Sequence, residues 1–369
     1  MKVLADVEVS GKRVFVRADL DVPLEQLTIG NLQLTKLIRL QSLKSTIDWL
    51  LEHGASQVII AGHIDRPKKP DPALSTKLLV EPLEKILGQK ITFESQSVSQ
   101  LTGDTPGVSM AATLYTPGVS KEIILLENLR FWPGETTSDP EFARRLASMA
   151  DVYVNEAFGV CHRKNASVVA LPSLFTDVED PEGFHPRRAA GLHLEEEVNQ
   201  LTKLIKNPER PFVAIIGGAK IETKVPVIEN LAKMADLVLV GGLIAQEIQK
   251  LKFKNQKYNS KIKIAQADKD CEDINNESID KFKQIIATAK TIVWNGPMGV
   301  FEEGFEAGTM AIAKAIVESG AYSIVGGGET TEFLSSKELI SKFSFVSVGG
   351  GAMLEFLAGK RLPGIEALN

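Results

Sequence analysis

The sequence of 369 residues has only two cysteines, Cys161 and Cys271, and they lie far apart in the chain. Two distant cysteines form neither a disulfide framework nor a metal-ligand pattern. The sequence also has no apolar run near the ~20 residues that a membrane-spanning helix needs. Its first stretch, MKVLADVEVSGKRVF, lacks the basic and apolar regions of a signal peptide. These absences favour a soluble protein in a reducing compartment, and we expect a cytoplasmic location.

The sequence also has fewer basic residues than acidic ones, 42 Lys and Arg against 47 Asp and Glu. The formal net charge is −5 and the isoelectric point is about 5.7. Proteins that bind nucleic acid or an anionic membrane surface usually carry an excess of Lys and Arg. We therefore expect no nucleic-acid partner and no membrane partner, but a monomer that binds small molecules. Any site for an anion must be a local cluster of cations on an acidic background.

Short apolar runs alternate with helical patterns along the whole chain. Nearly continuous apolar strands separated by helices predict parallel sheets with helices on both faces. A single domain rarely grows past about 250–300 residues, so we expect two α/β domains. The expected strands are 13–22, 57–63, 91–95, 122–131, 151–158, 211–218, 235–242, 261–266, 290–296, 322–328 and 343–351. Among the expected helices are 40–54 and 139–150.

A linker helix is expected between the two halves. Over residues 192–211, Leu194, Val198, Leu201 and Ile205 recur at helical spacing, and Pro208 and Pro211 end the pattern. Two other segments, 176–191 and 253–278, are polar and are predicted to be largely loop.

Glycine follows strand after strand in the second half, at Gly217-Gly218, Gly241-Gly242, Gly326-Gly327-Gly328 and Gly349-Gly350-Gly351. In a parallel sheet these turns share one edge, where open α/β sheets bind ligands. Bare backbone N–H groups at helix starts suit phosphate. The alternative is that they are only tight turns. The Walker pattern is absent, and Thr331 and Leu354 stand where a dinucleotide fingerprint needs its third glycine.

Two lysines, Lys220 and Lys224, follow the first of these glycine turns. Close to phosphate-binding amides they would form a charge clamp, and Pro226 is placed to open the following helix. The alternative is that both lysines are simply solvated.

The first half places cations after its strands, where arginine suits carboxylate and phosphate. Taken singly, each would be a surface residue, but together they predict a site for a small multivalent anion at one sheet edge. The residues are Arg39, His63, Arg66, Arg130, His162 and Arg163.

These stretches resemble the phosphoglycerate kinase family along nearly the whole chain. The resemblance implies two Rossmann-like domains with parallel sheets facing a cleft, and a C-terminal tail that returns to the N-terminal domain. It implies reversible transfer of phosphate from 1,3-bisphosphoglycerate to ADP, with Mg²⁺, to give 3-phosphoglycerate and ATP. The stretches are VRADLDVP, GHIDRP, LLENLRF, NEAFGVCHR, NPERPFVAIIGGAKIETK, TIVWNGPMGVFE, IVGGGET and SVGGGAMLEFLAGKRLPG.

The resemblance also implies roles for single residues. Residues 1–191 would bind phosphoglycerate, 192–210 would be the hinge, 211–345 would bind nucleotide, and 346–369 would be the tail. The implied substrate-binding residues are Asp19, Leu20, Asp21, Arg39, His63, Ile64, Asp65, Arg66, Arg130 and Arg163. The implied nucleotide-binding residues are Gly218, Lys220, Lys224, Asn295, Glu302, Gly327, Gly328, Glu329 and Thr330, with Glu302 on the ribose and Glu329 on Mg²⁺. Arg39, Lys220, Gly328 and Gly351 would be catalytic.

The chain departs from the family pattern at several positions. The family motif D-F-N reads Asp19-Leu20-Asp21 here, and H-L-G-R reads His63-Ile64-Asp65-Arg66, so each adds a carboxylate beside an anion site. Glu329 replaces an Asp, Val348 replaces a hydroxyl residue, 243–278 is shorter, and 176–186 resembles an insertion. Two alternatives therefore stay open: a drifted relative that binds phosphorylated ligands or phosphorylates another carboxylate, and a protein without catalysis.

Overall fold

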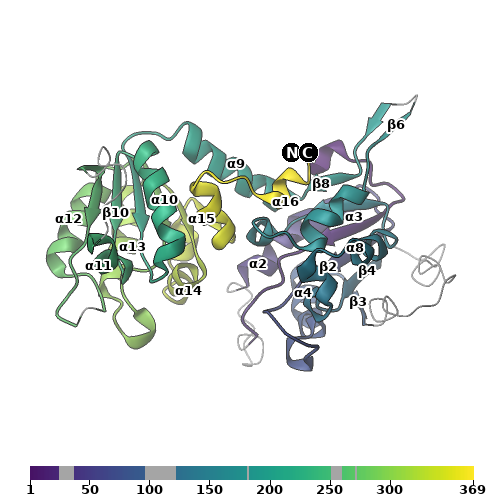
Figure 1. Ribbon diagram of the computed structural model, residues 1–369, viewed down its shortest axis with the longest axis horizontal. Helices are drawn as coiled ribbons and strands as arrows, with labels where there is room; N and C mark the ends of the chain where they lie inside the picture. Colours follow the sequence, from purple (N-terminus) through teal and green to yellow (C-terminus); the bar gives the residue numbers. More distant parts are fainter. Residues whose placement is uncertain (25–36, 96–121, 181–182, 251–259, 271) are drawn as a thin grey trace. The chain divides into compact units, whose positions relative to one another are not determined.

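The computed structural model describes residues 1–24, 37–95, 122–180, 183–250, 260–270 and 272–369 (Figure 1). Cys271 and much of the connection before Arg39 lie outside the described residues. The chain divides into two compact units. Unit 1 consists of Met1–Glu196 and Arg361–Asn369, and unit 2 of Glu197–Lys360. Strand β14, Phe345–Ser347, and helix α15, Gly351–Leu357, therefore belong to unit 2, and only Arg361–Asn369 at the end of the chain joins unit 1.

The sheet of unit 1 has six strands, and all its pairings are parallel. In spatial order the strands are β3 Ile91–Glu94, β4 Glu122–Leu126, β2 Gln57–Ala61, β1 Arg13–Arg17, β5 Val152–Asn155 and β8 Arg188–Ala190. The described α-helices within unit 1 are α2 Ile38–Gln41, α3 Leu43–Glu52, α4 Val80–Leu87, α7 Pro133–Thr137, α8 Pro140–Ala147 and α16 Pro363–Glu366.

The sheet of unit 2 also has six parallel strands, but they follow a different order. In spatial order they are β11 Ile262–Ile264, β10 Leu237–Val240, β9 Phe212–Ile216, β12 Thr291–Asn295, β13 Tyr322–Gly326 and β14 Phe345–Ser347. Its described α-helices are α10 Ile221–Met234, α11 Ile244–Lys250, α12 Asn276–Ile286, α13 Ala307–Ser319, α14 Gly328–Ser336 and α15 Gly351–Leu357. The predicted α/β fold with parallel sheets is confirmed.

Alternation along each strand builds a core on both faces of each sheet. In unit 2, Ile215 and Trp294 join a buried cluster with residues of α12 and α13. Their neighbours in sequence, Ile216 and Val293, are equally buried but point to the opposite face. Local signals set the helix ends: the Asp139 side chain accepts hydrogen bonds from the N–H groups of Glu141 and Phe142 and caps α8.

Helix α9, Leu192–Lys206, carries the chain from unit 1 into unit 2, as the apolar spacing over 192–211 predicted. The predicted loop at 176–191 is wrong. It contains the antiparallel pair β6 Val178–Asp180 and β7 Gly183–His185, and then β8 at the sheet edge. The helix expected to open at Pro226 begins at Ile221 and keeps Pro226 inside it. Among the described residues, no helix has the length and apolar character needed to cross a bilayer.

Candidate active site

Unit 1 gathers its cations where its parallel strands end. Asp19 and Asp21 follow β1, the segment His63–Arg66 follows β2, Arg130 lies on the turn after β4, and Arg163 follows β5. Because the carboxyl ends of parallel strands meet at one edge, these groups are brought to the same edge. We call the five arginines Arg17, Arg39, Arg66, Arg130 and Arg163, together with the imidazole of His63 that lies among them, the cation cluster.

The buried imidazole of His63 shows how closely the cations gather. Its Nδ1 lies 3.1 Å from Nη2 of Arg17, and its side chain is almost fully buried. Burial lowers the pKa of His63 well below its usual value, and the charges of Arg17, Arg130, Arg39 and Arg163 lower it further. His63 is therefore neutral near pH 7 and serves as a hydrogen-bonding group among the cations.

Arg17 is a member of the cluster that the sequence reasoning missed. It lies within β1 and is completely buried. Its Nε donates to Oγ of Ser167 at 2.7 Å, and Ser167 in turn donates to the buried carboxylate of Glu135 at 2.6 Å. A charged residue inside the apolar run RVFVR was the available signal. These partners compensate the buried charge of Arg17 and hold its side chain in place. Because Nη2 of Arg17 lies beside Nδ1 of His63, Arg17 orients the imidazole.

Arg39, at the start of the helical segment after β1, lies beside both acidic residues of that turn. Its Nη1 donates to the backbone carbonyl of Asp21 at 2.6 Å. The same Nη1 lies 3.7 Å from Oδ1 of Asp19 and 3.9 Å from Oδ2 of Asp21. Its side chain remains partly exposed, so its guanidinium can still reach a ligand.

Arg130 is held by the turn after β2. Its Nη1 donates to the carbonyl of Asp65 at 2.5 Å, while its Nε is buried with no hydrogen-bond partner among the described residues. Burial and the neighbouring arginines lower the pKa of Arg130 to about 10, and the carboxylate of Asp21 opposes that shift. A guanidinium that is partly desolvated and has an unused N–H is a strong hydrogen-bond donor to an anion.

Leu20 and Ile64, two of the residues implied by resemblance, have side chains in the hydrophobic core. Any contact they make with a ligand must therefore come from their backbone. Arg66 is exposed, and it and Arg163 both contribute to lowering the pKa of Arg130.

In unit 2, three glycine turns pack directly on one another. The N–H of Gly218 donates to the carbonyl of Pro297 at 2.8 Å. A Cβ at Gly217 would overlap that same carbonyl, and a Cβ at Gly242 would come 2.6 Å from the nitrogen of Gly218. These glycines are therefore required by packing between the turns after β9, β10 and β12.

Lys224 lies under this edge, in the first turns of α10. It is buried, and its Nζ donates to Oδ1 of Asn295 at the end of β12. Burial lowers the pKa of Lys224 to about 8, Glu329 opposes the shift, and the charge of Lys220 adds to it. Lys220 itself is exposed at the N-cap of α10. The two lysines, Asn295 and Glu329 thus form one electrostatic group.

The turn after β13 completes the same group. The N–H of Gly296 donates to Oγ1 of Thr330 at 2.9 Å, and a Cβ at Gly327 would come 3.1 Å from Nδ2 of Asn295. Gly327 has a φ of +102°, which side-chain residues rarely adopt. Gly328 differs, because a Cβ there would meet no atom within 4 Å and its φ is ordinary. Nothing in the fold requires a glycine at 328.

The implied nucleotide-binding residue Glu302 and the implied catalytic residue Gly351 are not tied into this group. Glu302 is exposed on the short helix η11 Phe301–Glu303, and Gly351 is the exposed first residue of α15. The hydrogen bonds described for unit 2 do not connect Glu302 to Lys224 or Asn295.

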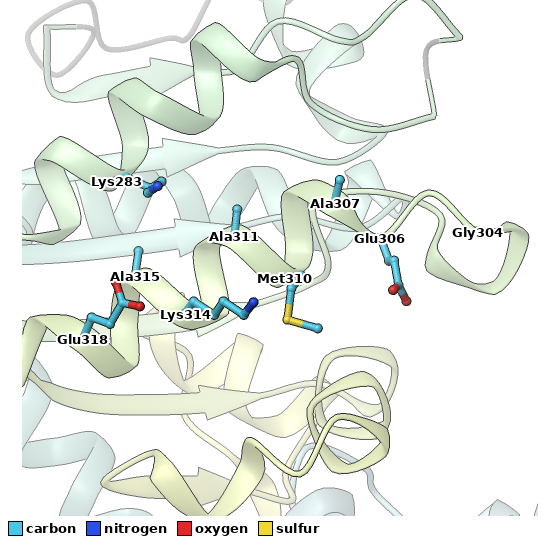
Figure 2. A pocket seen from close by; sticks show the side chains of 9 residues that line it. All are labelled: Lys283, Gly304, Glu306, Ala307, Met310, Ala311, Lys314, Ala315 and Glu318. Carbon is cyan, nitrogen blue, oxygen red and sulfur yellow. The ribbon is translucent and has the colours of Figure 1, made fainter.

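A groove on α13 lies apart from these residues. Figure 2 shows its small apolar side chains and Met310, with Lys283, Lys314 and Glu318 among its charged residues. None of the implied substrate or nucleotide residues lines it, so it is not the candidate site. In the described part of the chain, no group of three or more His, Cys, Asp or Glu residues could hold a metal by itself.

A family model for phosphoglycerate kinase matches residues 4–259 and 247–360. The chain is 37% identical to "Phosphoglycerate kinase" of Solibacter usitatus over 407 residues, covering 99% of this chain and 98% of that protein. It is 36% identical to "Phosphoglycerate kinase, cytosolic" of Triticum aestivum, with 99% and 97% covered. The chain belongs to the phosphoglycerate kinase family.

Two solved structures of the phosphoglycerate kinase family share the fold. The enzyme from Pyrococcus horikoshii superposes with a TM-score of 0.80 at 28% identity, covering 100% of this chain and 98% of that one. The enzyme from Coxiella burnetii gives 0.76 at 31% identity, with 99% and 98% covered. The two-unit architecture is therefore that of the family.

Two departures from the phosphoglycerate kinase pattern are in direct contact. Oδ1 of Asp21 accepts a hydrogen bond from the N–H of Asp65 at 2.8 Å. Asp65 has a φ of +53°, a left-handed conformation that favours glycine but that Asp tolerates better than most residues. The carboxylate of Asp21 is thus bound to the backbone of the turn that carries Asp65.

Proposed function

We propose that this phosphotransferase catalyses reversible phosphoryl transfer between 1,3-bisphosphoglycerate and ADP, giving 3-phosphoglycerate and ATP. The observation that carries the proposal is the convergence of the cation cluster on one sheet edge of an acidic protein. Its charges act together on His63 and Arg130. A substrate with a carboxylate and a phosphate is the kind of ligand that several arginine forks bind.

We assign phosphoglycerate to unit 1 and the nucleotide to unit 2. In unit 1, Arg39, Arg66, Arg130 and Arg163 supply charge, and neutral His63 supplies a hydrogen bond. In unit 2, Lys220 and Lys224 neutralise the nucleotide phosphates, and the bare N–H of Gly328 at the start of α14 approaches them. We expect Gly351, at the start of α15, to act in the same way.

Glu329 is the residue we assign to Mg²⁺. It lies on the first turn of α14, is exposed, and its Oε2 is 3.9 Å from the position of a Cβ at Gly218. Mg²⁺ at nucleotide sites is often held by one or two carboxylates plus phosphates and water, so a single Glu fits this requirement. The bound ion would neutralise charge on the transferring phosphate.

The chemistry needs no general base. The acceptor is a carboxylate, which with an ordinary pKa near 4 is already ionised at neutral pH. What remains is to position the reactants and to stabilise charge on three phosphoryl oxygens. Arg39 and Lys220 are the side chains we assign to that stabilisation. Transfer also requires the two ligands to meet in line, and we expect this step to depend on the α9 connection.

A coupled assay with purified protein, Mg-ATP and 3-phosphoglycerate tests the proposal. We expect turnover by the wild type and a loss of about 10²-fold or more in kcat for Arg39→Met and for Lys220→Met. Lys44→Met is the matched control, because Lys44 is exposed on α3 and pairs only with Asp48 in the described structure. A folded wild-type protein without turnover would refute the assignment.

The cytoplasmic location and the monomeric state are also part of the proposal. Analytical ultracentrifugation tests whether the protein is a monomer.

The drifted relative remains the second candidate, because a carboxylate lies inside the cation cluster at Asp21. On that hypothesis the enzyme phosphorylates a different carboxylic acid. A panel of phosphorylated and unphosphorylated 2-hydroxy acids in the same assay separates the two. Faster turnover with another acid than with 3-phosphoglycerate would favour the drifted relative.

A further inference from the structure

Asp21 places a negative charge within the cation cluster. Its Oδ2 lies 3.9 Å from Nη1 of Arg39 and 3.9 Å from Nε2 of His63. Its charge also favours the protonated form of Arg130, which places it in the field of that guanidinium as well. The Asp21 side chain is 42% exposed, whereas that of Asp19 is 3% exposed. The carboxylate of Asp21 is therefore the one that a ligand entering the cluster would meet.

The same carboxylate also organises the backbone that holds the arginines. Oδ1 of Asp21 accepts from the N–H of Asp65, and the carbonyl of Asp65 accepts from Nη1 of Arg130. The carbonyl of Asp21 accepts from Nη1 of Arg39. The N–H and the carbonyl of Asp65 are both hydrogen-bonded, which helps to hold this residue at its left-handed φ. Asp21 thus connects Arg39 on one side with Arg130 on the other.

These two contributions have opposite effects on an anionic ligand. The hydrogen bond to Asp65 keeps the cations in place and favours binding. The negative charge repels a ligand phosphate or carboxylate and weakens binding, more strongly as the charge of the ligand rises. An amide of the same shape would keep the first contribution and remove the second.

We propose that Asp21 is a specificity-determining residue whose carboxylate acts as a built-in counter-anion and lowers the affinity of the cation cluster for multiply charged phosphorylated acids. The inference rests on the proposed function for the identity of the ligand, 3-phosphoglycerate. It goes beyond that function by stating which charge limits the binding.

Two substitutions separate the charge from the hydrogen bond. Asp21→Asn keeps an oxygen that accepts from Asp65 but loses the charge, so its Kd for 3-phosphoglycerate should fall about tenfold, equivalent to ~1.4 kcal/mol. Asp21→Ala loses both the charge and the hydrogen bond. Its affinity for 3-phosphoglycerate should therefore rise much less than that of Asp21→Asn, or fall below that of the wild type. Calorimetry gives both affinities, and thermal melting shows that each variant folds.

The control is Asp48→Asn. Asp48 is exposed on α3 and pairs with Lys44, so this variant changes the net charge equally but away from the cluster. Its affinity should equal that of the wild type. The difference in affinity for 3-phosphoglycerate between Asp21→Asn and the wild type should shrink as NaCl rises from about 20 to about 300 mM, because salt screens a partly exposed charge. The affinity for Mg-ADP should stay unchanged, which a general change of the fold would not allow.

Inorganic phosphate is the second probe, and it separates failure of the inference from failure of the proposed function. Tighter phosphate binding in Asp21→Asn, with no binding of 3-phosphoglycerate to either protein, supports the counter-anion and refutes the proposed substrate. Binding of 3-phosphoglycerate that is equal or weaker in Asp21→Asn overturns the counter-anion and leaves the proposed function standing.

Discussion

The carboxylate of Glu156 accepts a hydrogen bond of 3.0 Å from the backbone N–H of Leu194, in the first turn of α9. It accepts a second bond of 3.0 Å from the N–H of His193 and a third of 2.5 Å from Oγ1 of Thr46. Glu156 is buried and follows β5. A side chain that follows β5, the neighbour of the edge strand β8 in the unit 1 sheet, therefore satisfies N–H groups that the start of the connecting helix leaves open.

The contribution of Glu156 to the stability of unit 1 should fall as pH rises through the carboxyl range. Burial raises the pKa of Glu156 above its usual value, although the charge of His193 and the three hydrogen bonds oppose the shift. Between the unfolded pKa of about 4.3 and the raised folded value, the folded state binds more protons. The free energy of unfolding therefore decreases with pH in that window.

Glu156→Gln does not titrate and should remove this contribution to the pH slope. Urea unfolding between pH 4 and 8 measures it, with Trp294→Phe as background so that fluorescence reports Trp49 and Trp132 of unit 1. Glu81→Gln, an exposed residue that pairs with Lys85, is the control and should keep the wild-type slope. An unchanged slope in Glu156→Gln would show that another group is responsible.

Nucleotide affinity should fall as pH rises through about 8. The lysine at 224 has a lowered pKa of about 8 in the free protein because it is buried, and phosphate binding needs its charged form. Calorimetry with Mg-ADP at pH 7, 8 and 9 should show a decline in the wild type. Lys224→Met should bind about tenfold or more weakly at pH 7 and lose this pH dependence. A decline that persists in Lys224→Met would assign the titration elsewhere.

Gly328→Ala should weaken nucleotide binding without destabilising the fold. The fold leaves room for a Cβ at Gly328, and alanine is a better helix former than glycine. The Cβ would instead lie where a phosphate approaches the helix start. We expect stability within about 0.5 kcal/mol of the wild type and at least a tenfold rise in the Kd for Mg-ADP.

Gly217→Ala is the contrasting variant. Its Cβ would overlap the carbonyl of Pro297, so unfolding by urea should show a clear loss of stability. If Gly328→Ala destabilises the protein as much as Gly217→Ala, or leaves Mg-ADP affinity unchanged, the glycine at 328 does not serve the ligand.

Much of the fold followed from the sequence because β-branched runs with glycine at their ends are unambiguous in a parallel sheet. Strands such as Phe212–Ile216 and Thr291–Asn295 lie inside the predicted ranges. The predicted strands extended beyond the observed ones. The range 13–22, for example, included residues after Arg17 that belong to the turn following β1. The edge strand Arg188–Ala190 was missed because three polar and small residues carry no apolar pattern.

The placement of the site could be predicted in part. Residues after strands share an edge in any parallel sheet. The structure places Arg130 after β4 and Lys224 in the helix after β9, and their roles in ligand binding stay predictions. The sequence could not show that Lys224 is buried on Asn295, or that Asp21 accepts from Asp65, because both contacts join segments far apart in the chain. Arg17 was missed because it lies within a predicted strand and not after one, and its tertiary partner Ser167 cannot be seen from the sequence.

His63 should remain neutral across the range in which free histidine titrates. Burial and four neighbouring arginines lower its pKa well below the usual value of about 6.5. Its imidazole ε1 resonance in a proton–carbon NMR spectrum, assigned by its loss in His63→Gln, should not shift between pH 8 and 6. Addition of 3-phosphoglycerate supplies negative charge and should raise the pKa of His63. A midpoint near 6.5 in the free protein would mean that the arginines do not act on this ring as the structure places them.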